Sequence, residues 1–177
     1  ANAYKGATVV HEGVLEFNTL ANGGVNSAIG ASDEFAQNWI LDGGTYRYTG
    51  GSTSTNRSMM IYKESTFDIA NASTTVTMTG SVEGAGNFVL DGKGKLSVAT
   101  SKLFTMDGDV VLRGGNLYLS TTDISKAGIG TAGKLVMAGG TLSTKGERDG
   151  YETYDFPMQV EEGTTSIFAP NRNCYWT

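Results

Sequence analysis

Carboxylates are the side chains of this sequence that could do acid–base chemistry. Glycoside hydrolysis needs two Asp or Glu residues facing one cleft, and lyase chemistry usually pairs calcium-binding Asp residues with a Lys or Arg base. Asp91, Asp107 and Asp109 are close enough in the sequence to approach one another. Asp91 and Asp107 each precede a glycine, however, and Asp-Gly turns explain both positions equally well. The sequence therefore does not favour a catalytic pair.

Metal and nucleophile chemistry have less support still. His11 is the single histidine, so no second histidine can complete a triad or a metal site with it. Cys174 is the single cysteine, which excludes an internal disulfide and a cysteine-based zinc site. A C-terminal acidic group could bind calcium, but its spacing fits no EF-hand loop, and a solvated acidic face explains it better. Its members are Glu147, Asp149, Glu152, Asp155, Glu161 and Glu162. We expect no metal and no cofactor.

Aromatic side chains offer another chemistry, because their apolar faces can stack on sugar rings. The candidates for a carbohydrate-binding surface are Tyr118 and Trp39, together with Arg47 as a solvent-facing cation. Trp39 fits the core better, and Tyr175 and Trp176 could cap the end of the domain. Packing or capping is the simpler explanation for each of these aromatic residues.

The composition predicts that strands position these side chains. The chain has 177 residues, with 25 Gly, 2 Pro and only 18% charged residues. Glycine and threonine weaken helix interiors, so short strands joined by tight turns are favoured. The 39% of hydrophobic residues supply a core that a disordered chain would lack. One domain suits this length.

Charge and hydropathy limit the classes of partner. The formal net charge of -5 gives no electrostatic reason to bind nucleic acid, and it also disfavours other anionic partners. Apolar runs stay well short of the roughly 20 residues that a membrane helix needs. We therefore expect no nucleic-acid partner and no direct membrane insertion.

An internal repeat organises the predicted strands. Residues 38–48, 109–119 and 134–144 each contain a short apolar run, Gly-Gly, a small polar residue and a second strand, and looser copies span 8–17 and 87–98. The glycines that mark these corners are Gly13, Gly43, Gly44, Gly92, Gly94, Gly114, Gly115, Gly139 and Gly140. The long interval between Gly44 and Gly94 suggests two coils, with a degenerate corner near residues 65–69. Coils of about 20–30 residues predict a parallel β-solenoid, whose strands stack about 4.8 Å apart.

Strand alternation then predicts an inside and an outside. Aligning the repeats places two columns inward, Tyr46 with Leu117 and Leu142, and Tyr48 with Leu119 and Thr144. Arg47, Tyr118 and Ser143 should face solvent. Parallel β-helices also include polysaccharide lyases and hydrolases, but the aligned column before the glycines is Asp42, Arg113 and Ala138. Acidic side chains therefore do not recur from coil to coil, which argues against catalysis.

Residues 2–16 (NAYKGATVVHEGVLE) resemble the second half of the autotransporter-associated β-strand repeat, in which Asn-x-Tyr-x-Gly-x-Thr-x-Val precedes a Gly-x-Leu strand. Residues 84–98 resemble its first half, and the resemblance extends from residue 2 to about residue 145. It departs at 101–106, where SKLFTM replaces the expected Asn-x-Tyr-x-Gly segment. The resemblance implies a right-handed parallel β-helix in a large exported protein of a Gram-negative bacterium. Residues 154–177 are similar to a segment found in surface proteins of the Bacteroides group.

These observations predict β-helix coils over residues 1–145 and a C-terminal β segment over 146–177 that continues or caps the solenoid. We expect a fragment of a longer protein, located outside the cell or on its surface in association with the outer membrane. The expected function is a non-catalytic, rigid and adhesive stalk, whose stacking coils aid export and whose loops bind glycans or host surfaces. Its partners would be the rest of its own chain and such glycans. The alternative is a carbohydrate-active β-helix enzyme or its sugar-binding module.

Overall fold

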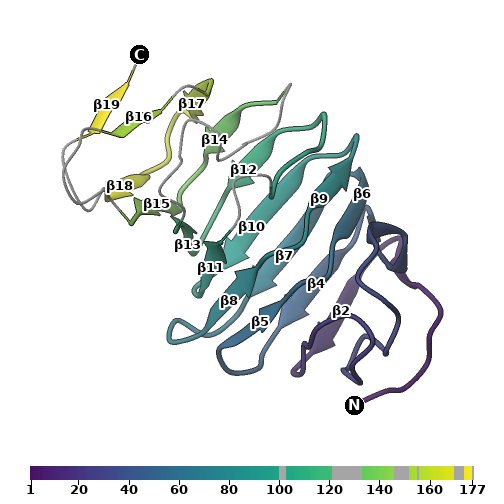
Figure 1. The fold of residues 1–177 in the computed structure, drawn as a ribbon. Helices are drawn as coiled ribbons and strands as arrows, with labels where there is room; N and C mark the ends of the chain where they lie inside the picture. The colour runs from purple at the N-terminus through teal and green to yellow at the C-terminus, as the bar shows by residue number, and fades with distance from the viewer. Residues whose placement is uncertain (100–102, 121–132, 146–151, 155, 170–173, 177) are drawn as a thin grey trace.

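The computed structural model describes residues 1–99, 103–120, 133–145, 152–154, 156–169 and 174–176. All ladders between the named strands in these residues are parallel. The helical content of the same residues is one 3-10 turn, η1 (Ala36–Asn38). Successive strands stack along one axis from the N-terminus to the C-terminus (Figure 1). The predicted all-β fold is confirmed as a parallel β-solenoid of about five coils.

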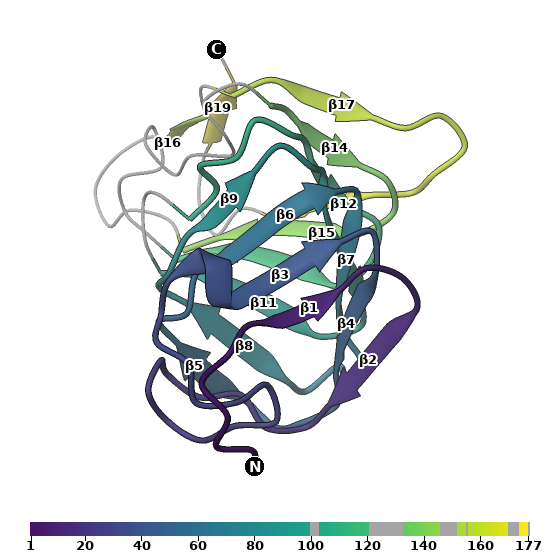
Figure 2. The ribbon, with the colours of Figure 1, turned by 90° about the vertical axis from the view of Figure 1, so that its right-hand side faces the viewer.

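Three parallel sheets surround the core (Figure 2). Sheet 1 contains β1 (Thr8–Val10), β3 (Trp39–Asp42), β6 (Met59–Lys63) and β9 (Val82–Gly84). Sheet 2 contains β2 (Val14–Phe17), β4 (Thr45–Tyr48), β7 (Ser65–Ile69), β10 (Phe88–Gly92), β12 (Val110–Leu112), β14 (Leu135–Met137) and β17 (Met158–Val160). Sheet 3 contains β5 (Thr53–Thr55), β8 (Thr75–Met78), β11 (Lys95–Val98), β13 (Asn116–Leu119), β15 (Thr141–Thr144) and β18 (Ile167–Ala169). A separate ladder joins β16 (Glu152–Tyr154) to β19 (Cys174–Trp176).

The strand register of sheet 2 gives the length of each coil. Phe88 pairs with Ser65 on one side and with Val110 on the other, and Val110 pairs with Leu135. Successive coils therefore have the predicted length of about 20–30 residues. Strand β7 stacks between β4 and β10, so the interval from Gly44 to Gly94 does hold two coils. Within the segment 146–177, β17 pairs with β14 and β18 pairs with β15, which adds strands to sheets 2 and 3.

The glycine corners lie on two different edges of the solenoid, which corrects the repeat alignment. One set joins sheet 1 to sheet 2, namely Gly13, Gly43 and Gly44. The other joins sheet 2 to sheet 3, namely Gly92, Gly94, Gly114, Gly115, Gly139 and Gly140. Both edges need a sharp turn, and the same residue type meets that need: Gly43 has φ 106 and Gly115 has φ 63. Similar turns at two edges therefore look like one repeat in the sequence.

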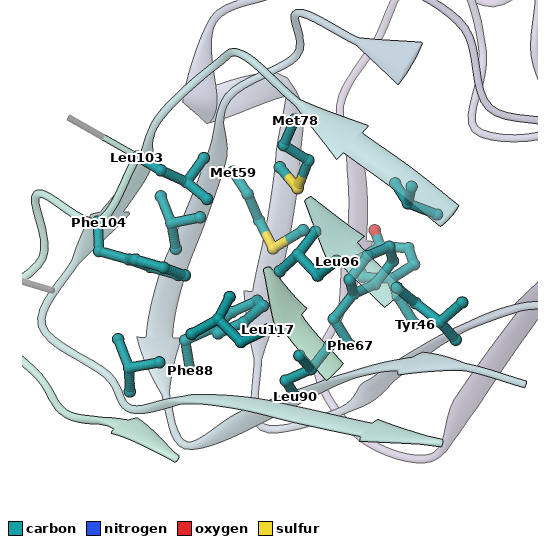
Figure 3. Close-up of a cluster of buried hydrophobic side chains, with 14 of the residues drawn as sticks. Tyr46, Met59, Phe67, Met78, Phe88, Leu90, Leu96, Leu103, Phe104 and Leu117 are labelled. Carbon is teal, nitrogen blue, oxygen red and sulfur yellow. The ribbon is translucent and has the colours of Figure 1, made fainter. Parts of the chain in front are cut away.

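This correction moves the tyrosines to another column but keeps them inside. Tyr46 pairs with Leu15 and Phe67 in sheet 2, whereas Leu117 pairs with its own neighbours in sheet 3. Both columns point inward. Side chains alternate between the two faces of a strand, and this alternation begins in the same phase after each glycine corner, whichever two sheets the corner joins. Tyr46 and Leu117 are each 0% exposed, so the predicted inward direction is confirmed. Figure 3 shows these side chains converging in one core.

The core differs in character between its walls. Sheet 2 contributes aromatic side chains from its first strands, namely Phe17, Tyr46, Tyr48, Phe67 and Phe88, and aliphatic ones further along, such as Leu90, Leu112 and Leu135. Sheet 3 contributes mainly aliphatic ones, namely Val76, Met78, Leu96, Val98, Leu117, Leu119 and Leu142. The aromatic rings meet edge to face, with 5.9 Å between the centroids of Phe17 and Tyr46.

A buried arginine fixes the first long loop against the coils. Arg57 lies between β5 and β6 and is 1% exposed. Its guanidinium donates hydrogen bonds to the carbonyl oxygens of Ala21 and Gly30, both at 3.1 Å, and to Ser32 Oγ at 2.9 Å. Burial lowers the pKa of Arg57. A cation buried in this way is stable because backbone oxygens replace its water shell.

Candidate binding surface

The structure separates carboxylates that the sequence placed together. Asp91 lies near the C-terminal end of β10, whereas Asp109 directly precedes β12. Because β10 and β12 are parallel with Phe88 beside Val110, Asp91 and Asp109 lie at opposite ends of sheet 2. The possibility that Asp91 approaches Asp109 is therefore excluded, in agreement with the prediction that they form no catalytic pair. Asp109 is held locally, since its Oδ1 accepts a hydrogen bond from the Lys134 backbone nitrogen at 3.1 Å.

The outer face of sheet 2 carries a charged column that the repeat alignment missed. The register pairs Glu16 with Arg47, Arg47 with Asp68, and Asp68 with Asp91. Arg47 Nε lies 3.7 Å from Glu16 Oε2 and 3.6 Å from Asp68 Oδ2. We call these four residues the charged column. The repeat alignment did not predict this column, because it assigned both kinds of glycine corner to one edge. The neighbours of a residue on adjacent strands are known only when each strand has been assigned to a sheet.

Two like charges meet within the charged column. Burial raises the pKa of Asp68; Arg47 lowers it, and Asp91 and Glu16 raise it further. Asp68 Oδ1 is buried without a hydrogen-bond partner. Glycosidases hold their two carboxylates on either side of a sugar, about 5–9 Å apart. Asp68 and Asp91 project from the same face of neighbouring strands, and Arg47 lies 3.6 Å from Asp68 on its other side, so Asp68 is part of a cross-strand charge contact.

A second charged group lies at the corner between sheets 1 and 2. Asp42 accepts a hydrogen bond from His11 Nδ1 at 2.9 Å, and its other oxygen lies 3.1 Å from Lys63 Nζ. These bonds to His11 and Lys63 lower the pKa of Asp42, although burial acts in the opposite direction. The three residues stack in consecutive coils, which explains their contact by strand pairing.

Two of the predicted sugar-contacting residues are committed to other contacts. Trp39 is 1% exposed, and its ring centroid lies 5.7 Å from that of Tyr46 and 6.0 Å from that of Phe67. The interpretation that Trp39 faces the core is confirmed, and a sugar cannot reach its ring. Arg47 is exposed but lies between the two carboxylates of the charged column.

Tyr118 occupies a different environment, on the outer face of sheet 3. It lies between Ser97 and Ser143 on the neighbouring strands and is partly exposed. Lys95, diagonally across on β11, holds its Nζ 5.1 Å from the centre of the tyrosine ring. The Ser143 hydroxyl donates to Asn116 Oδ1 at 2.6 Å, which fixes the Asn116 carboxamide two residues before Tyr118 on the same strand.

The outer face of sheet 3 is flat and free of carboxylates. One outward column contains Ser54, Thr77, Ser97, Tyr118, Ser143 and Ala169, and the next contains Thr75, Lys95, Asn116, Thr141 and Ile167. The six described strands of this sheet contain neither Asp nor Glu. Most of these side chains are short hydroxyls, and the large groups on the face are Tyr118, Lys95 and, on the last strand, the exposed Ile167. We call this area the Tyr118 face.

A shallow hollow by the first loop is less suited to a sugar. It encloses about 230 Å³ and is lined by Lys5, Gly24, Ala31, Ser32 and Asp33. This lining contains one cation and one carboxylate but has no aromatic ring for a sugar to stack on. The Tyr118 face is therefore the better candidate.

The structure describes only part of the predicted C-terminal acidic group. Glu147, Asp149 and Asp155 lie outside the described residues, and Glu161 and Glu162 are exposed next to β17. Among the residues that the structure describes, His, Cys, Asp and Glu side chains form no group of three or more that could hold a metal ion. Within the same part of the chain, the structure contains no helix with the length and hydrophobicity to cross a membrane.

The chain is similar to a segment of an autotransporter adhesin. The adhesin BmaC autotransporter of Brucella suis biovar 1 is 34% identical over 167 residues, which cover 82% of this chain and 5% of that protein. No protein-family model and no solved structure matches the chain. The similarity and the parallel solenoid together fit an autotransporter passenger-type repeat, whereas the link to the Bacteroides group stays a prediction.

Proposed function

We propose that this chain is a non-catalytic, structural and adhesive β-helical segment of a large exported bacterial surface protein. The observation that carries the proposal is the 34% identity to an autotransporter adhesin over most of the chain, combined with a continuous parallel solenoid. In this function the core gives rigidity along the stack, and the rest of the longer chain continues it. The location would be the cell surface or the medium.

Adhesion would use the outer surface of the coils rather than their core. The Tyr118 face combines a partly exposed aromatic ring with a cation and hydrogen-bonding hydroxyls on a sheet surface, which are groups that recognise sugars. The carboxylates of sheet 2 support stacking instead, because Arg47 bridges Glu16 and Asp68. Coil upon coil folding outside the cell would also favour export in one direction.

An adhesion assay tests this function. Beads coated with the 177-residue chain should attach to cultured epithelial cells or to purified extracellular matrix above beads coated with albumin. Attachment no better than albumin would contradict the adhesive part and leave a purely architectural repeat. The non-catalytic part has its own test, because reducing-sugar release from polysaccharides should stay at background. Release that disappears in Asp68→Asn would establish an enzyme.

A further inference from the structure

We propose that the Tyr118 face binds a carboxylate-bearing sugar, a uronate or sialate residue of a glycan. This inference rests on the proposed adhesive function and specifies the class of ligand. Three features of the described residues carry it: the Lys95–Tyr118 pair, the lack of carboxylates in sheet 3, and the short side chains on both sides of the ring.

The Lys95–Tyr118 pair joins an aromatic surface to a cation. The Lys95 ammonium lies 5.1 Å from the Tyr118 ring centre. A cation–π contact leaves the ammonium N–H groups able to donate to an anion. A sugar carboxylate bound there brings its own pyranose ring beside Tyr118, where the C–H face of the sugar can pack on the part of the aromatic ring that Lys95 does not cover.

Local charge favours an acidic ligand here, although the whole chain is negative. The expectation that anionic partners are disfavoured came from the net charge of -5, which averages over all surfaces. The carboxylates Glu16, Asp68 and Asp91 lie on sheet 2, whereas the described strands of sheet 3 contain Lys95 and no acidic residue. Exposed charges act mainly on groups within about 8–10 Å at physiological salt, so the charge nearest to a bound ligand counts most. The Tyr118 face therefore presents a positive group to a ligand in contact with it.

The neighbours of the ring leave room for a sugar and offer it hydrogen bonds. Ser97 and Ser143 flank Tyr118 on the adjacent strands with short side chains, of which Ser97 is only 7% exposed. Asn116, fixed by the Ser143 hydroxyl, lies beside Lys95 in the register. Hydroxyl and carboxamide groups at this spacing can bond to sugar hydroxyls while the ring and the ammonium hold the acidic residue.

Calorimetric titration of the 177-residue chain with defined oligosaccharides tests the inference. The acidic probes are 3′-sialyllactose and trigalacturonate, which separate sialate from uronate, and lactose is the neutral match for the first. We expect saturable binding of at least one acidic probe, about tenfold or more tighter than lactose, and weaker at high salt. Equal binding of lactose and 3′-sialyllactose, without binding of trigalacturonate, would overturn the acidic specificity. Binding of neither acidic probe would overturn the site.

Matched variants locate the binding. Tyr118→Ser and Lys95→Gln should each weaken the binding of the acidic probe about tenfold or more. Tyr62→Ser removes an exposed tyrosine of sheet 1, and Arg47→Gln removes an exposed cation of sheet 2; both should bind as the parent chain does. Circular dichroism confirms that each variant is folded. If Tyr118→Ser binds normally, the inference fails. Bead attachment that persists in Tyr118→Ser would sink this inference while leaving the adhesive function standing.

Discussion

Sheets 2 and 3 stack in the same parallel manner around one core, yet their outer faces are built differently. Sheet 2 places charged residues in register, with Glu16, Arg47, Asp68 and Asp91 on consecutive strands. Sheet 3 places mainly Ser, Thr and Asn there, with Lys95 as its charged residue. Neighbouring members of one column lie on strands about 4.8 Å apart. A column of charged side chains is therefore favourable only where positive and negative charges alternate along it. Neutral hydroxyl groups can stack without any such alternation of charge, and they leave the outer surface of sheet 3 available to a ligand.

The inner faces differ as well. Sheet 2 packs aromatic rings against Trp39, whereas sheet 3 packs aliphatic side chains against them. Sheet 2 also has a small apolar column on its outside, formed by Val89, Val111 and Val136. Sheet 2 thus supplies most of the aromatic rings of the core, whereas the outer side chains of sheet 3 are mainly hydroxyls. Four predictions test these differences between the sheets.

The largest effect should come from the aromatic side of the core. Phe67 is fully buried at the centre of sheet 2, and Phe67→Ala should lower the free energy of unfolding by about 3–5 kcal/mol, since the lost side chain leaves a cavity. Urea denaturation measures this loss. Tyr62→Ala, on an exposed tyrosine of sheet 1, should change stability by no more than about 0.5 kcal/mol. Similar losses in both variants would show that Phe67 is not a core residue.

The next effect concerns the like charges of sheet 2. Burial and Asp91 raise the pKa of Asp68 above its ordinary value of 3.8, so the native state holds this proton more tightly than the unfolded state. Stability should then fall as the pH rises through the interval between these two pKa values. Asp68→Asn should stabilise the chain at pH 7 by about 1 kcal/mol, because the unpartnered oxygen no longer carries charge. The gain should shrink below pH 3.8 in thermal melts; an unchanged gain would contradict the raised pKa.

A smaller effect should distinguish the cations of the two sheets. Arg47→Met removes the bridge between Glu16 and Asp68 and should cost about 0.2–1 kcal/mol at low salt. Lys95→Met removes a cation that contacts Tyr118 rather than a carboxylate, so its cost should depend less on the salt concentration. Denaturation at low and high salt measures both. An equal, salt-independent loss in the two variants would remove the electrostatic distinction between the sheets.

The smallest effect belongs to the corner between sheets 1 and 2. Bonds to His11 and Lys63 lower the pKa of Asp42, so its ionised form stabilises the fold above its ordinary pKa of 3.8. That contribution is lost as the pH falls through the lowered pKa. Asp42→Asn should therefore melt slightly below the parent chain at pH 7 and together with it at strongly acidic pH. This sign is opposite to that of Asp68→Asn, and melts that shift in the same direction would contradict it.

The candidate surface could be predicted from the sequence only in part. Alternation places Tyr118 outward and Trp39 inward, because the direction of a side chain depends on its own strand. The pairing of Tyr118 with Lys95 needs the register between β11 and β13, which no local pattern supplies. Arg57 was missed for the same reason, since its oxygen partners lie about 25–36 residues earlier in the chain.

The sequence by itself determined the class of fold, the approximate coil length and the inward residues of each strand, because strand periodicity and glycine turns are local properties. The tertiary structure alone decided which corner each glycine occupies, and therefore which charges meet on sheet 2 and which hydroxyls surround Tyr118. Glycines form the turns at two edges of the solenoid, so an alignment of sequence repeats cannot tell which edge a given glycine occupies. Stacking can, because the pairing between coils assigns each strand to one sheet and so each glycine corner to one edge.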